Sequence, residues 1–205
     1  MSLFNIFKKA EKTAYAVENK SAGLSKDTLV SVSGTFRHID GMAIFFEPNP
    51  DNVIKGGIDA PQAWDGGIKH YENAVRNLVI PGGIKSFASY FFMNWAVTEL
   101  FTLPDSVEYT GDENDSVCVF SNCFLPEVRL PGSIKLLGNF AFGSSCIKKL
   151  VVDPAIKSKY LRQFKDSTIE ELYLPGSIVN LRNSDEIYVF YSNFYVHCKC
   201  HIIEY

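Results

Sequence analysis

The chain has 205 residues, a net charge of −3 and 46% apolar residues, which excludes a disordered protein because disordered chains have few apolar and aromatic residues. Its 20 Lys and Arg are scattered among 23 Asp and Glu, so it lacks the basic face of a nucleic-acid binder. The longest apolar runs are too short to cross a membrane. Phe outnumbers Leu, 16 to 15, although Leu is normally the commonest apolar residue.

Residues 1–70 are predicted to be an N-terminal cap on the rest of one continuous domain. Apolar residues recur at helical spacing after Ser2, which predicts an amphipathic helix ending near Lys20. One interpretation is that this helix packs on the end of the fold. The other is that it contacts a membrane surface or a partner through its lysines. We favour the first, because glutamates interrupt the basic face.

A β-hairpin is predicted after this helix. Residues 29–36 alternate in polarity, and Asp40-Gly41 separates them from the apolar residues 42–46. Asp-Gly between two strand-like runs is a strong hairpin signal.

Turn residues predominate between this hairpin and residue 71. A degenerate copy of the repeat described below is one interpretation of Pro50–Val53. Residues 55–70 are rich in Gly and Pro, which predicts turns. A short helix is expected around His70–Arg76.

A proline-centred phrase recurs through residues 71–205 and predicts a solenoid of about five repeats. Its prolines are 21 to 27 residues apart, which matches leucine-rich repeats of roughly 20–29 residues. Apolar residues alternate before each proline, which predicts a strand that the proline ends. Gly or Asp with Ser then supplies the turn. The copies are Leu78–Ile84, Phe101–Val107, Val128–Ile134, Leu172–Ile178 and the weaker Val151–Ile156.

The copy that contains Pro154 departs from the phrase. When the copies are aligned on their prolines, Asp153 stands where Leu is expected and Ile156 comes one position early. A β-bulge that shifts the register by one residue is expected there.

An aromatic residue returns once in every repeat. This regularity predicts a column of rings stacked inside the solenoid and explains part of the Phe excess. The residues are Phe92, Phe120, Phe142, Phe164 and Phe190.

The five cysteines are an odd number and contain no C-x-x-C, so buried thiols are predicted instead of a disulfide framework. Cys123 and Cys146 both follow the repeat phenylalanine by three or four residues. We therefore expect them at equivalent repeat positions.

The repeat phrase, followed by Phe140-Ala-Phe142 and Cys146, resembles the BspA-like class of bacterial leucine-rich repeats over about residues 71–200. The resemblance implies an α/β leucine-rich-repeat solenoid, horseshoe-like and β-rich with little helix, and an N-terminal helix and hairpin as its cap. Members of the class are typically surface or secreted adhesion modules that bind proteins and are not enzymes. Residues 1–20 carry no secretory signature, which predicts a cytoplasmic protein. A surface or secreted location and a cytoplasmic one therefore both remain as alternatives.

The segment His197-Cys-Lys-Cys-His201 contains residue types that suit zinc. Its flanks predict a terminal strand, on which the His and Cys side chains would point to opposite faces. The two His would also lie ~13 Å apart at roughly 3.3 Å per residue. We therefore predict no metal and no cofactor, and a metal-dependent or hydrolytic enzyme using Cys198, Cys200 and both His is the alternative.

Two acidic insertions, Gly111–Ser116 and Asn183–Glu186, have the carboxylates that calcium prefers. Neither has the ligand spacing of a known calcium loop, so solvated loops are the favoured interpretation.

The outward side chains of the predicted sheet are the candidate binding site, since stacked strands form an extended surface. Tyr and Arg are favoured anchors of interfaces. We thus predict a non-catalytic scaffold that binds a protein or glycan partner through this face or its loops. A third hypothesis is a structural fragment that self-associates through the N-terminal helix. The outward residues are Asn77, Val79, Thr102, Glu127, Arg129, Glu171 and Tyr173.

Overall fold

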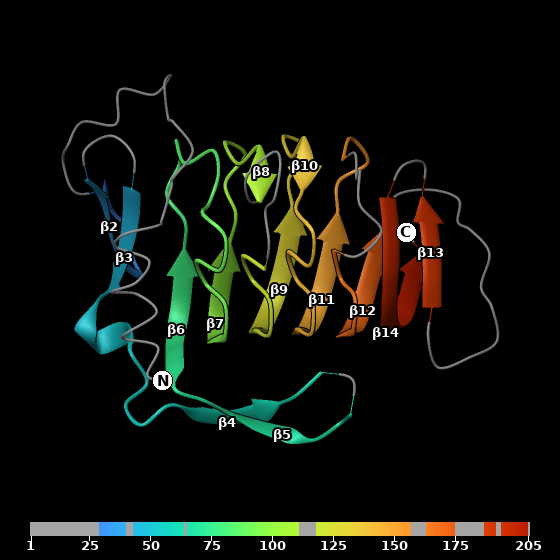
Figure 1. Ribbon diagram of the computed structural model, residues 1–205, viewed down its shortest axis with the longest axis horizontal. Helices are drawn as coiled ribbons and strands as arrows, with labels where there is room; N and C mark the ends of the chain where they lie inside the picture. The colour runs from blue at the N-terminus through green and yellow to red at the C-terminus, as the bar shows by residue number, and fades with distance from the viewer. Residues whose placement is uncertain are drawn as a thin grey trace.

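The computed structural model describes residues 29–39, 43–63, 65–110, 118–156, 163–174, 187–191 and 194–204. These residues form a β-solenoid in which one strand of each turn joins a common sheet (Figure 1). Within the described ranges, the single helix is a short 3-10 turn. The predicted β-rich leucine-rich-repeat solenoid with little helix is therefore confirmed.

The helix η1 covers Pro50–Asn52. The strands in chain order are β1 (Leu29–Val30), β2 (Gly34–Ile39), β3 (Ala43–Pro48), β4 (Ile58–Pro61), β5 (Ile68–Tyr71), β6 (Asn73–Val79), β7 (Trp95–Thr102), β8 (Tyr109–Thr110), β9 (Phe124–Leu130), β10 (Leu136–Leu137), β11 (Cys146–Val152), β12 (Ser167–Leu174), β13 (Ile187–Tyr191) and β14 (Phe194–Glu204).

The main sheet has seven strands in the order β6-β7-β9-β11-β12-β14-β13. Neighbouring strands from β6 to β14 are parallel, and β13 pairs antiparallel with β14 at the far edge. Strands β8 and β10 form a small parallel pair on another side of the coil (Figure 1). Parallel pairing follows from the repeat, because each turn of the coil returns the chain to the same edge in the same direction.

In the parallel strands, buried and exposed side chains do not alternate strictly, because two successive residues point outward. In β11, Ile147 and Leu150 are fully buried, whereas Lys148 and Lys149 between them lie at the surface. Strands β9 and β12 repeat this pattern. We call the residues up to the first residue of the outward pair the first segment of a strand, and those from the second residue of the pair onward the second segment.

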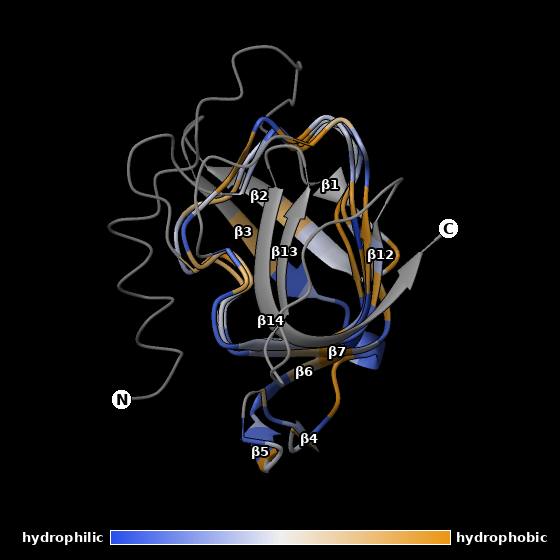
Figure 2. Cartoon of the chain, turned by 90° about the vertical axis from the view of Figure 1, so that its right-hand side faces the viewer, coloured by the Kyte–Doolittle hydropathy of each residue, from blue (hydrophilic) through white to orange (hydrophobic). Residues whose placement is uncertain are grey.

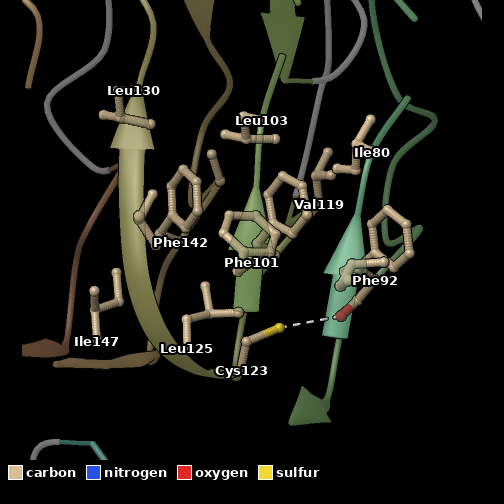
Figure 3. Close-up of a cluster of buried hydrophobic side chains, with 14 of the residues drawn as sticks. Ile80, Phe92, Phe101, Leu103, Val119, Cys123, Leu125, Leu130, Phe142 and Ile147 are labelled. Atoms are coloured by element: carbon tan, nitrogen blue, oxygen red, sulfur yellow. Dashed lines mark hydrogen bonds between the residues drawn. The ribbon is translucent and has the colours of Figure 1, made fainter. Parts of the chain in front are cut away.

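The repeat phenylalanines stack inside the coil, as their spacing predicts. Successive rings have centroids 5.1 to 5.4 Å apart and planes within 15° of parallel. Figure 3 shows Phe92 and Phe142 among the aliphatic side chains of this core. The column is confirmed for Phe92, Phe120, Phe142 and Phe164, and the side chain of Phe190 lies outside the described residues.

The turns that carry Phe92, Phe120 and Phe142 are each hydrogen-bonded through their backbone to the next turn of the coil. The N–H of Phe92 donates to the carbonyl of Val119 at 2.9 Å, and that of Phe120 donates to Ala141 at 2.7 Å. Two residues after each ring, the chain adopts a positive φ, which Asn, Asp and Ser side chains tolerate better than bulky ones. Those residues are Asn94, Asn122, Ser144 and Asp166.

The expected bulge in the fourth copy of the phrase is wrong. Strands β9 and β11 pair in register from Cys146 opposite Phe124 to Val152 opposite Leu130. Asp153 therefore occupies the position of Pro131, and its carboxylate accepts the N–H of Ala155 at 2.8 Å to close the turn. Pro154 is thus displaced by one residue relative to the prolines of the other copies, whereas the strand before it keeps its register.

The expected equivalence of Cys123 and Cys146 is also wrong. Cys146 pairs with Phe124, one residue later than Cys123, so the two thiols point to opposite faces of the sheet. Cys123 lies in the inner core and Cys146 in a separate cluster on the outer face. Both are buried, as predicted, and Cys118 is half-buried.

The predicted hairpin around Asp40-Gly41 is confirmed, because β2 and β3 pair antiparallel from Gly34 opposite Pro48 to Ile39 opposite Ala43. Residues 29–36 are not one strand, however. β1 folds back on β2, and the hydroxyl of Ser31 closes the turn by donating to the carbonyl of Gly34 at 2.9 Å.

The helix expected around His70–Arg76 is wrong, since these residues belong to strands β5 and β6. The segment Pro50–Val53, interpreted above as a degenerate copy of the repeat, lies mostly in the helix η1. The strand before it, β3, pairs with β2 in a separate sheet and does not join the main sheet. The predicted helix ending near Lys20 lies outside the described residues.

A second hairpin, formed by β4 and β5, crosses the outer face of the sheet, although sequence composition predicted only turns there. In Figures 1 and 2 it lies below the starts of the parallel strands and projects from the coil. Gly57 allows this arrangement: its φ is +72°, and a Cβ there would lie 2.3 Å from the carbonyl oxygen of Tyr71. The hairpin buries the outer side of the first segments, with a cluster made of Ala60, Tyr71, Ala74, Ala96, Phe124 and Cys146.

Candidate functional site

The second segments of β9, β11 and β12 present a continuous polar surface. Glu127, Lys149 and Glu171 are neighbours in one row across the three strands. Arg129 and Tyr173 flank Val151 in the next row. We call these five polar residues and Val151 the outer-face row.

Side-chain contacts join the polar members of the outer-face row. Arg129 Nε lies 2.5 Å from Glu127 Oε1, and Lys149 Nζ lies 3.5 Å from Glu127 Oε2. Lys149 Nζ also sits 4.7 Å from the centroid of the Tyr173 ring, and the Tyr173 hydroxyl donates to Glu171 Oε2 at 3.0 Å. Each charged member therefore has a partner within the outer-face row, which is an opposite charge, an aromatic ring or, for Glu171, the hydroxyl of Tyr173.

Because the side chains of the outer-face row are partly exposed to solvent, a partner can replace these contacts with its own. The Arg129 side chain is 68% exposed, so its ion pair with Glu127 contributes little to stability. The hydrogen bond to Glu171 raises the pKa of Tyr173 and keeps the phenol protonated. The surface thus offers a guanidinium, an ammonium, a phenol and two carboxylates to a partner, all positioned by rigid strands.

Four of the sequence-predicted residues come together here: Glu127, Arg129, Glu171 and Tyr173. Asn77 does not join them. It lies on β6, separated from β9 by β7, and its backbone is bonded to Asn52. Val79 and Thr102 pair with each other on β6 and β7, away from the outer-face row. The binding role of all seven residues stays a prediction.

Sequence reasoning missed Lys149 and Val151, which lie in the middle of the outer-face row. The reason is the alignment on prolines, which displaced the fourth copy by one position. The signal was available in Ile156, because aligning it with Ile134 restores the register that β9 and β11 adopt.

The remaining chemistry-bearing residues do not assemble into a second site in the described part of the chain. No group of three His, Cys, Asp or Glu residues could hold a metal ion there. His70 Nδ1 lies 2.9 Å from Asp59 Oδ1 on the hairpin, and both side chains are largely exposed. This contact is a solvent-exposed hydrogen bond between two side chains of the hairpin.

The two buried cysteines are protonated thiols near neutral pH, as is typical of cysteines with a structural role. Burial raises the pKa of Cys123 to about 12 and that of Cys146 to about 11. The Cys123 thiol donates to the carbonyl of Phe92 at 3.1 Å, a contact that Figure 3 shows as a dashed line. A thiol at these pKa values is a poor nucleophile near neutral pH.

The segment His197–His201 lies in strand β14, so the predicted terminal strand is confirmed. Its side chains lie outside the described residues, as do the acidic insertions Gly111–Ser116 and Asn183–Glu186. In the described part of the chain, no helix is long and apolar enough to span a membrane.

Comparison with known proteins agrees with this architecture. The family model for the BspA type leucine rich repeat region matches six copies over residues 69–195, more than half of the chain. The chain therefore belongs to the BspA-type leucine-rich-repeat family. No curated protein and no solved structure matches the chain significantly. The family is one of repeat scaffolds, often used for interaction and generally non-catalytic.

Proposed function

We propose that this protein is a non-catalytic scaffold that binds a protein partner through the outer-face row. The observation that carries the proposal is the contiguity of Glu127, Arg129, Lys149, Glu171 and Tyr173 on three adjacent strands. Arg and Tyr are enriched among the residues that dominate binding energy. Rigid strands also hold these side chains in place before binding, which lowers the entropic cost of association.

The other parts of the outer face support this location. The β4–β5 hairpin covers the first segments of β9 and β11 at Phe124 and Cys146, so these positions are not available to a partner. The second segments have no such cover among the described residues, and Arg129 is exposed there. The family resemblance supports a surface or secreted location and a role in adhesion, which are part of this proposal.

Site-specific cross-linking tests the proposed surface. A photoreactive amino acid replaces Val151, between Arg129 and Tyr173, in one variant and the exposed Asp105, at a turn after β7, in a matched control. We expect a partner that cross-links at 151 and not at 105. Cross-linking at both positions with equal yield would contradict the proposal, because it would indicate non-selective contact.

Affinity measurements with the captured partner then test the individual residues. Arg129→Glu and Tyr173→Ala should each weaken binding by about tenfold or more, since truncation of an interface anchor costs about 1.4 kcal/mol or more. Lys55→Glu, an exposed change outside the outer-face row, is the control. Unchanged affinity in Arg129→Glu and Tyr173→Ala would overturn the assignment. A glycan array probed with the same variants would show whether the partner is a glycan instead.

A further inference from the structure

Strand β6 forms one edge of the main sheet, and an edge strand exposes backbone groups that can pair with another chain. β7 satisfies one side of β6. The other side is closed without a full strand. At the start of β6, the carbonyl of Ala74 accepts the N–H of Ile54 at 2.9 Å, and Val53 makes an isolated bridge with Val75. Further along β6, side chains make the hydrogen bonds that the backbone of a neighbouring strand would make.

Asn52 forms the first side-chain pairing. Its Oδ1 accepts the N–H of Asn77 at 2.7 Å, and its Nδ2 donates to the carbonyl of Asn77 at 2.6 Å. A primary amide has the same donor and acceptor as a peptide group. Asn52 therefore makes the two hydrogen bonds that a residue of a neighbouring strand would make. Its second Nδ2 proton goes to the carbonyl of Ser33 at 2.8 Å.

Ser33 forms the second pairing two residues further along. Its hydroxyl accepts the N–H of Val79 at 2.7 Å and lies 3.4 Å from the carbonyl of Val79, to which it donates. Ser33 is fully buried and Asn52 is 5% exposed. Water does not have free access to these bonds, so they close the edge as a strand would.

We propose that Asn52 and Ser33 act together as a surrogate strand that blocks pairing of β6 with β6 of a second copy of this chain. Two copies of an open edge can meet about a twofold axis as antiparallel strands. β6 carries one charged residue, Arg76, and its charge is already held by Glu99 at 3.8 Å and by the carbonyl of Asp51 at 2.7 Å. No unpaired like charge in β6 therefore opposes the approach of two copies.

The double variant Ser33→Ala/Asn52→Leu tests this inference in the full chain. It removes both surrogate pairings and keeps the cap apolar. We expect light scattering to give twice the wild-type mass at the same concentration. We also expect hydrogen exchange to be faster at the amides of Asn77 and Val79 when the variant is diluted to the monomer. Asn49→Ala is the matched control, because the hydrogen bond from Asn49 Nδ2 goes to the carbonyl of Val32, which precedes β6, and not to β6 itself.

A folded double variant with the mass of the wild type would overturn the proposal. If circular dichroism shows that the double variant is unfolded, the single variant Ser33→Ala decides the question, since it opens only the end of β6 at Val79. A larger mass in this folded single variant supports the inference. An unchanged mass, or an unchanged exchange rate at Val79, refutes it.

Discussion

The two faces of the parallel strands are buried in different ways. On the inner face, the stacked rings of Phe92, Phe120, Phe142 and Phe164 come from the repeat itself, one from each turn of the coil. On the outer face, the cluster around Phe124 and Cys146 is covered by Tyr71 and Ala60 of the β4–β5 hairpin, which precedes the parallel strands in the chain. The repeat therefore builds its own core, whereas in the described part of the chain its outer face is buried where the β4–β5 hairpin crosses it.

The two buried cysteines illustrate this difference. Cys123 points inward and donates to a carbonyl of the preceding turn, a position that Ser145 fills in the next repeat by donating to Phe120 at 2.7 Å. Small hydrogen-bonding side chains thus fill this position in two successive turns, whereas Trp95 fills it in the turn before them. Cys146 points outward and is buried because the hairpin lies over it. The same residue type is buried once by periodicity and once by a tertiary contact.

The largest expected effect comes from breaking the inner column. Phe120→Ala should lower the free energy of unfolding by about 3 to 5 kcal/mol, because a fully buried ring is lost and a cavity remains. Phe120 is in ring contact with Phe92, Phe142, Phe87 and Phe101. Denaturant titration measures the change. Phe140→Ala, at a half-buried position in the next turn, is the control. An equal loss in both variants would show that the column has no special weight.

A smaller effect is expected from loosening the outer cluster. Tyr71→Ala should lower the free energy of unfolding by about 2 to 3 kcal/mol, the order of one buried large side chain. It should also expose Cys146 to a thiol reagent under native conditions and leave Cys123 protected, because only the outer cluster opens. Mass spectrometry of the alkylated protein identifies the modified residue.

Tyr71→Phe is the control for the loosened hairpin, since it removes only the hydroxyl that donates to the carbonyl of Pro61 at 3.3 Å. It should leave Cys146 unreactive. If Cys146 stays protected in Tyr71→Ala, the hairpin is not what buries it, and the contrast between the two faces fails.

The smallest effect is expected outside both clusters, where Glu108 bridges Lys85 and Lys135 of the neighbouring repeats. Glu108→Gln should lower the free energy of unfolding by at most about 1 kcal/mol, because the bridge is at the surface. Hydrogen bonds to Lys135 and Lys85 hold the pKa of Glu108 below its usual 4.5. A lowered pKa means that the carboxylate stabilises the fold above pH 4.5 and loses this contribution as the pH falls through the folded-state pKa.

The difference in unfolding free energy between Glu108→Gln and the wild type should therefore shrink below pH 4.5. High salt at neutral pH should shrink it too. A difference that is independent of both pH and salt would mean that Glu108 acts through packing and not through its charge.

Sequence by itself determined the inner half of this protein. A strand ended by proline, with an apolar residue three positions later and a phenylalanine in each turn, is enough to specify the coil, because every repeat packs on a copy of itself. The column of rings and the buried Ile84, Val107 and Ile134 follow directly from that spacing. Four of the five polar residues of the outer-face row could be found in the same way.

Only the tertiary structure decided the register of the fourth copy, the opposite faces of Cys123 and Cys146, and the closure of β6 by Asn52 and Ser33. A one-residue displacement of a proline is ambiguous in sequence, since either the turn or the strand can absorb it. The hairpin over Cys146 and the side chains that close β6 come from segments outside the repeat. Periodicity carries no information about such contacts, because each is made once, between residues that no other repeat contains.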